Sequence, residues 1–198
     1  MKIKKIVDLC KKSGRCVFYN TDEGQWLSDG GAAYPLMNLP DFDSMSFCQT
    51  YDINDKAAEK IVFKQITGLP EGISFADTNE GEEISVRGKI AIFAGGKKLI
   101  PYQTSTGIAF VDQKYLAPLA DIEDNLLELY ERYTKSGQLY FAAKTGLLLV
   151  AVIFPVNIVE KQFVGLLKDL TKRCEAALFA KGSSSEMENA QMSLLEEE

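Results

Sequence analysis

The chain of 198 residues contains no histidine. Histidine is the side chain that most often exchanges protons near neutral pH, so its absence excludes Ser-His and Cys-His nucleophile pairs. A metal site would have to use carboxylates and thiolates alone. The sequence therefore favours a protein without enzymatic activity, and we expect neither a cofactor nor a metal. Carboxylate or lysine chemistry stays open to an enzyme.

Paired-cysteine motifs and long apolar runs are also lacking. The four cysteines show no CxxC spacing, and no uninterrupted apolar run near the N-terminus resembles a signal peptide. The longest apolar run, residues 146–156, is about half of the ~20 residues that a membrane-spanning helix needs. We expect a cytoplasmic protein without membrane contact, and a buried strand at this run.

Net charge is scarce over most of the chain. The formal net charge is -6, and residues 183–198 hold five acidic and no basic side chains, so subtracting -5 leaves -1 for residues 1–182. A nearly neutral body does not indicate whole-surface attraction to nucleic acid. The 46% apolar content is typical of a globular domain with a substantial core. We predict one domain over residues 1–182 and a disordered acidic tail over residues 183–198.

The hydrophobic patterns predict an α+β fold, in which an antiparallel sheet of hairpins has helices packed on one face. Apolar side chains recur at helical spacing in residues 2–12 and in a long amphipathic segment, residues 158–180, which should pack across the sheet. Turns containing glycine predict hairpins within residues 16–28, 89–102 and 137–154.

The remaining segments give weaker patterns. Residues 122–134 fit a helix and half-fit a strand. Asn54 or Asp55 could cap a helix that ends near Gln65. Extended segments are expected at residues 32–36, 46–53, 73–76 and 107–111, the third of them within a loop over residues 69–81.

A short apolar segment ends the polar tail. Its residues are Gln191, Met192, Ser193, Leu194 and Leu195. This five-residue stretch resembles the peptide by which bacterial polymerases, repair proteins and replication accessory factors dock on the DNA sliding clamp. The resemblance implies that Gln191 hydrogen-bonds in a polar pocket, that Met192 and Ser193 form an extended spacer, and that Leu194 and Leu195 fill an apolar cleft. The alternatives are a final helix over residues 187–195 that touches the body, or an acidic end that aids solubility.

The most distinctive segment of the body is residues 25–35. Aromatic side chains beside glycines are common in ligand sites, so this segment could form a ligand groove lined by Trp26, Asp29, Gly30, Gly31 and Tyr34. The alternative is a combination of core and turn. In its general pattern the body also resembles uncharacterised proteins of bacterial prophages and mobile elements, a resemblance that implies no activity.

Basic side chains gather in the first predicted helix. They are Lys2, Lys4, Lys5, Lys11, Lys12 and Arg15. A positive helix face could neutralise nucleic-acid phosphates, or it could simply be solvated.

Residues 94–98 (AGGKK) lack the spacing of a phosphate-binding loop, so a hairpin turn is favoured there. Asp41 and Asp43 could bind a divalent cation, but turn chemistry explains them more simply.

Three hypotheses follow from the sequence. The first is a non-enzymatic accessory protein of phage or mobile-element DNA replication that docks on the bacterial sliding clamp through its tail. The second is a small-molecule or nucleotide-binding domain, which could be an enzyme, with a groove near Trp26 to Tyr34. The third is self-association into a homo-oligomer through residues 158–180.

Overall fold

The computed structural model describes residues 1–70, 72–123 and 125–195, with side chains described as far as Lys181. The chain divides into two compact units, the body (Met1–Asn157) and the C-terminal unit (Ile158–Glu198). The predicted α+β class is confirmed, and most neighbouring strands are antiparallel.

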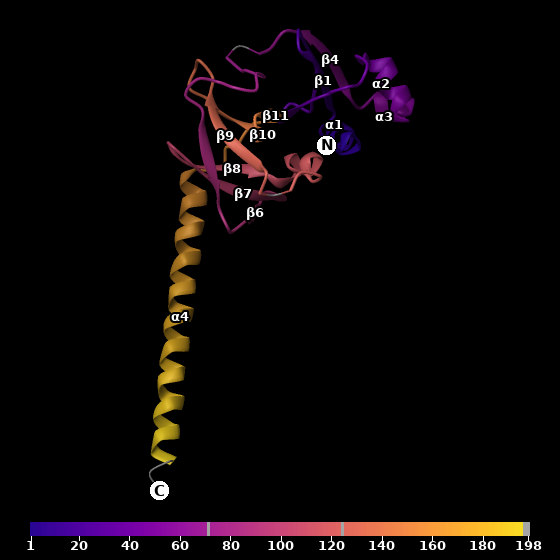
Figure 1. The fold of residues 1–198 in the computed structure, drawn as a ribbon. Helices are drawn as coiled ribbons and strands as arrows, with labels where there is room; N and C mark the ends of the chain where they lie inside the picture. Colours follow the sequence, from indigo (N-terminus) through magenta and orange to yellow (C-terminus); the bar gives the residue numbers. More distant parts are fainter. Residues whose placement is uncertain (71, 124, 196–198) are drawn as a thin grey trace. The chain divides into compact units, whose positions relative to one another are not determined.

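A large sheet forms the centre of the body (Figure 1). Within the described residues, its hydrogen-bonded order is β4-β1-β2-β3-β11-β10-β9-β5-β7-β6, and β8 also pairs with β7. The β1–β4 pair is parallel. The strands are β1 Arg15–Thr21, β2 Gly24–Ser28, β3 Ala32–Pro35, β4 Val62–Thr67, β5 Glu83–Arg87, β6 Ile92–Ala94, β7 Lys97–Thr104, β8 Gly107–Asp112, β9 Leu127–Tyr133, β10 Leu139–Thr145 and β11 Leu148–Ile153.

The three predicted hairpins are confirmed as β1–β2, β6–β7 and β10–β11. Gly95 and Gly96 have φ angles of 56° and 72°, which glycine adopts without strain, and Ala94 pairs directly with Lys97 across this two-residue turn. The ambiguous residues 122–134 contain β9, so their weak alternation was the correct signal. The prediction missed β5 altogether.

The first helix, α1 (Ile3–Ser13), matches the prediction and buries Ile6, Val7, Leu9 and Cys10. The extended segment predicted for residues 46–53 is wrong, because α2 (Ser44–Thr50) covers most of it. Asp43 and Ser46 form a capping box, with Asp43 Oδ1 accepting a hydrogen bond from the Ser46 amide at 2.7 Å. This cap starts the helix and lets Phe47 enter the core.

The helix predicted from Asn54 to about Gln65 is also too long. Asn54 does cap α3 (Asp55–Ala58), since its Oδ1 accepts from the Ala57 amide at 2.9 Å. The chain then leaves the helix and forms β4, which pairs in parallel with β1. Tertiary pairing therefore overrides local helical preference here. Residues 73–76 are irregular instead of the predicted strand.

Both faces of the sheet are buried around its central strands, whereas the residues of β4 and β6 are exposed or half-buried. On one face, the larger core cluster packs side chains of α1 and α2 against strand residues such as Phe18 and Phe141. On the other face, Trp26 and Tyr140 are covered by the loop of residues 69–82, whose Phe75 ring lies 4.2 Å from the Trp26 ring. Within the body, α1 and α2 thus cover one face and a loop covers the other. The packing of residues 158–180 across the sheet stays a prediction.

The C-terminal unit contains one helix, α4 (Lys161–Leu195). Its large apolar side chains as far as Phe179 are mostly exposed, and both core clusters draw their described members from residues 3–154. The backbone is helical beyond Ser183, where Glu, Ala, Gln, Met and Leu favour helix. The flexibility of the tail over residues 183–198 stays a prediction. No helix in the described part of the chain is both long and apolar enough to span a bilayer.

Candidate functional site: a basic cleft

A cleft of about 1030 Å³ opens in the body between α1, β5, β7, β9 and two short 3-10 helices, η1 (Gln113–Tyr115) and η2 (Ala117–Leu119). We call it the basic cleft, because its lining among the described residues includes six basic side chains and two acidic ones, Asp112 and Glu128. The basic residues are Lys2, Lys5, Arg87, Lys97, Lys98 and Lys114.

Hydrogen bonds fix the start of α1 beside the cleft. The Lys2 amide donates to the Pro118 carbonyl oxygen at 2.7 Å, which ties the first turn of the helix to η2. The Lys2 ammonium also pairs with Asp121 at 2.9 Å. Lys5 lies one helical turn further along α1, so this anchor places its side chain at the cleft as well.

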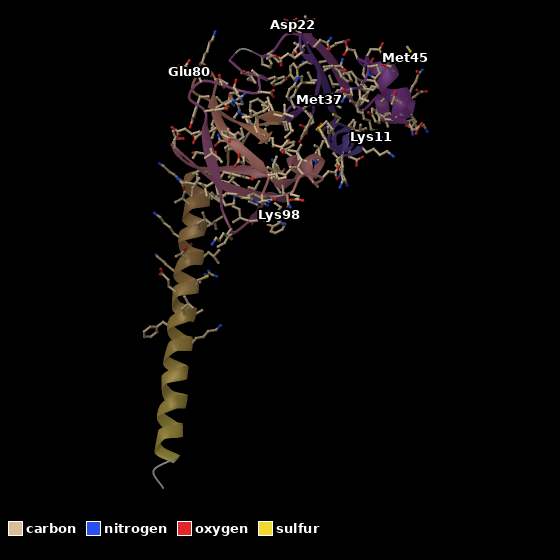
Figure 2. All side chains as sticks on the ribbon, in the orientation of Figure 1. Lys11, Asp22, Met37, Met45, Glu80 and Lys98 are labelled. Carbon is tan, nitrogen blue, oxygen red and sulfur yellow. The ribbon has the colours of Figure 1, made fainter. Side chains whose placement is uncertain are left out.

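The pairing of β5 with β7 places Arg87 and Lys98 on the same face of the sheet. Arg87 of β5 pairs with Tyr102 of β7, and directly paired residues share a face of an antiparallel sheet. Side chains alternate along β7, so Lys98 lies on the same face as Tyr102. The Gly95-Gly96 turn brings the start of β7 to the rim of the cleft, and Figure 2 shows Lys98 at the margin of the body.

Three of the six basic side chains in the cleft, Lys5, Lys97 and Lys98, have no ion-pair partner among the described residues. Lys2 pairs with Asp121, and Lys114 lies 4.0 Å from Asp112 and 4.6 Å from the centre of the Tyr115 ring. The cleft therefore concentrates positive charge in a body whose own net charge is negative, with 17 basic and 20 acidic side chains over residues 1–157.

Ser85 adds a hydroxyl to this wall. Its side chain is only 7% exposed, and within the described structure its Oγ has no hydrogen-bond partner. Leaving a buried polar group unpaired costs about 1–3 kcal/mol, so most native proteins satisfy such groups. Because Ser85 lines the basic cleft, a ligand held there could supply the missing partner.

A second, smaller cleft of about 420 Å³ adjoins the first. The two clefts share Arg87, Lys98 and Gln113, and the second adds Lys89 to the basic lining. The pair forms a basic track along the surface instead of one isolated pocket.

The predicted ligand groove is filled by the protein itself. Trp26 and Tyr34 are buried, and the Tyr34 hydroxyl donates to the Tyr115 carbonyl oxygen at 2.7 Å. Burial is also the main reason why the pKa of Tyr34 is raised well above its usual value. Asp29 is committed to its own turn, where its Oδ1 accepts from the amides of Gly31 at 2.9 Å and Ala32 at 3.1 Å.

The two glycines of this segment have packing roles. A Cβ at Gly31 would overlap the Tyr115 hydroxyl, and one at Gly30 would lie 2.9 Å from an Arg15 nitrogen. Trp26, Asp29, Gly30, Gly31 and Tyr34 do come together, but as core and turn. The ligand-binding hypothesis therefore loses its predicted site.

The other predicted residues have mixed outcomes. Of the basic helix, Lys2 and Lys5 line the cleft, whereas Arg15 packs against Gly30. Asp43 caps α2. The clamp motif, residues 191–195, follows the helical backbone of α4, but its side chains lie outside the described set.

Sequence reasoning missed Ser85, Arg87 and Lys114 because their segments are far apart in the chain. The local signals were the basic first helix with Lys2 and Lys5, and the pair Lys97-Lys98 after two glycines, which indicated only a hairpin. Comparisons of the chain with protein-family models, with curated proteins and with solved structures find no match.

Proposed function

We propose that the body is a binding module for a phosphate-bearing ligand, which it holds in the basic cleft. One observation carries this proposal: six basic side chains from separate elements converge on the cleft, although residues 1–182 have a net charge of only -1. Convergence of like charge is unfavourable in the free protein, and a polyanion relieves it.

The lining suits phosphate chemistry. Lysine ammonium groups act as point charges toward phosphate, and an arginine guanidinium donates two parallel hydrogen bonds to its oxygens. The Ser85 hydroxyl can donate one more bond from the wall of the cleft. Nothing in this lining is arranged to break a bond, so the proposal is binding without catalysis.

Titration of the full chain with tripolyphosphate, followed by calorimetry, tests this function. The double variant Lys97→Glu/Lys98→Glu should weaken binding at least tenfold, because it places two negative charges at the rim. Lys11→Glu/Lys12→Glu is the matched control, since these exposed lysines lie outside the cleft lining. Equal binding by both double variants and the unaltered chain would contradict the proposal.

A second candidate is the docking of the chain on the bacterial sliding clamp as a cytoplasmic accessory protein of phage or mobile-element replication. The supporting observation is the resemblance of residues 191–195 to the clamp-binding peptide, at the end of a helix of 35 residues. At 1.5 Å per residue this helix is about 50 Å long, which makes it a long spacer. Docking of an extended peptide would require the last turn to unwind, and helix ends fray readily.

Pull-down of purified clamp by the full chain tests the docking. Replacing Gln191, Leu194 and Leu195 by Ala should abolish the interaction, because burial of each leucine is worth roughly 1.5–3 kcal/mol. Met187→Ala, upstream of the motif, should leave it intact. Capture that survives the triple substitution would refute clamp docking by this motif without affecting the cleft.

A further inference from the structure

We propose that the ligand of the basic cleft is single-stranded nucleic acid, and that Phe93 stacks on one of its bases. This inference rests on the proposed function and makes it specific. It starts from Phe93 on β6, whose ring is 79% exposed and so is accessible to a ligand.

The register of β6 places this ring beside the cleft. Phe93 pairs directly with Lys98 of β7, so the two side chains lie on the same face of the sheet. Lys98 lines both clefts. An exposed aromatic ring thus stands next to the basic residue that the two clefts share.

This arrangement combines the two components of a single-strand site. Such sites use a positive groove that follows the phosphates and aromatic side chains on which bases stack. Stacking on a protein ring needs a base that is free on one face, which a duplex does not offer away from its ends. A single strand supplies both phosphates and bases that can stack, whereas free phosphate has no base to stack on Phe93.

The size of the track favours an oligomer over one small ligand. Sites for drug-sized molecules usually enclose about 300–1,000 Å³. The basic cleft alone is at the upper end of that range with about 1030 Å³, and the adjoining cleft continues it past Arg87 and Lys98. Lys5 lines the first cleft, Lys98 lines both and Lys89 lines the second, so a chain of phosphates that follows the track would meet basic side chains in each cleft.

Fluorescence anisotropy of the full chain tests this inference with labelled oligothymidylate and oligouridylate of about 12 nucleotides, a length within the usual range for such sites. We expect binding of at least one oligonucleotide, and a preference between them identifies DNA or RNA as the source. Raising salt from about 50 to 200 mM should give a slope of log K against log salt of about -3, since four phosphate contacts contribute about 0.7 each.

The decisive variant is Phe93→Ala. It should weaken oligonucleotide binding about tenfold, within the range for loss of one base–aromatic stack, and leave tripolyphosphate binding unchanged. Phe93→Trp should retain the affinity because indole also stacks. Ile108→Ala is the matched control, since Ile108 is an exposed apolar residue of β8 that lies outside the lining of both clefts.

The outcomes separate this inference from the proposed function. Tripolyphosphate binding that depends on Lys97 and Lys98, together with Phe93→Ala having no effect on the oligonucleotides, would overturn the inference and leave the proposed function standing. A duplex that binds as tightly as the single strands would also overturn the inference. If the unaltered chain bound neither tripolyphosphate nor the oligonucleotides, both the inference and the proposed function would be refuted.

Discussion

Two clusters of charged side chains in the body differ in their burial and in how far their charges are paired. In the first, which we call the buried cluster, Glu82 pairs with Arg132 and Lys144. In the basic cleft, most lysines are exposed and have no described carboxylate partner. The first arrangement pairs all three of its charges, and the second pairs Lys2 and Lys114 but leaves Lys5, Lys97 and Lys98 without a described carboxylate partner.

The buried cluster holds the loop of residues 69–82 on the sheet. Arg132 is fully buried, donates from Nε to Glu82 at 2.8 Å, and also donates to the carbonyl oxygens of Ala76 at 2.9 Å and Asp77 at 3.3 Å. The Lys144 ammonium completes the set and lies 4.6 Å from the centre of the Tyr130 ring. The comparison teaches that the matched charges of the buried cluster hold a loop in place, whereas Lys5, Lys97 and Lys98 have no described ion-pair partner.

The largest effect should come from breaking the buried cluster. Arg132→Met leaves Glu82 with one partner and removes the bonds to the loop carbonyls, so the free energy of unfolding should fall by about 3–5 kcal/mol. Urea denaturation followed by tryptophan fluorescence measures this, because Trp26 packs against Phe75 of the same loop. A loss below about 1 kcal/mol would show that the cluster does not hold the loop.

Acid should weaken the same cluster. Burial raises the pKa of Glu82, but hydrogen bonds from Lys144 and Arg132 and their charges outweigh it, so the pKa is lowered overall. A carboxyl whose pKa is lowered by folding stabilises the fold above its unfolded pKa of about 4.3, and this contribution disappears as pH falls through the folded value. The stability difference between the unaltered chain and Glu82→Gln should therefore shrink below about pH 4, as urea titrations at several pH values would reveal. A difference that is constant with pH would contradict this account.

Two serines give a smaller and sharper contrast. Ser105 donates its hydroxyl to buried Glu131 at 2.7 Å, so Ser105→Ala should lower the free energy of unfolding by about 1–2 kcal/mol. Ser85→Ala removes a buried hydroxyl without a described partner, so it should leave stability unchanged or raise it slightly. Thermal denaturation of both variants compares them directly. Equal losses would mean that the Ser85 hydroxyl is satisfied in the free protein.

The smallest effect on stability is expected at the rim of the cleft. Lys97→Met and Lys98→Met alter exposed residues, so each should change the free energy of unfolding by no more than about 0.5 kcal/mol. The same variants should weaken tripolyphosphate binding, which separates a binding role from a folding role. A loss of stability comparable to that of Arg132→Met would remove the distinction between the two clusters.

Local sequence signals predicted much of the fold. The glycine turns, the stripe of α1 and the apolar run of β11 each act over a few residues, and these elements are confirmed. The secondary-structure prediction is wrong where a segment's structure depends on pairing with a strand that is distant in the sequence. β4 forms because it pairs with β1. β5 lies between β9 and β7 and does alternate, with Ile84 and Val86 between polar residues, so a local signal for this strand was overlooked.

The sites show the same division. The sequence predicted that Trp26 and Tyr34 line a groove. Aromatic residues beside glycines are common both in protein cores and in ligand sites, so the sequence could not distinguish the two. Burial against Phe75 and the bond to Tyr115 decided between the two. The basic cleft carried no local motif and could not be predicted.

By itself the sequence determined the α+β class, the main hairpins and the uneven distribution of charge between body and tail, because these depend on composition and on periods of a few residues. Only the tertiary structure decided which charges are matched. Arg132 meets Glu82 across 50 positions of the chain, and Lys5 shares a cleft with Lys98, because the strand order and the docking of α1 bring them together. Electrostatic compensation depends on distance in space, and distance in space is fixed by packing.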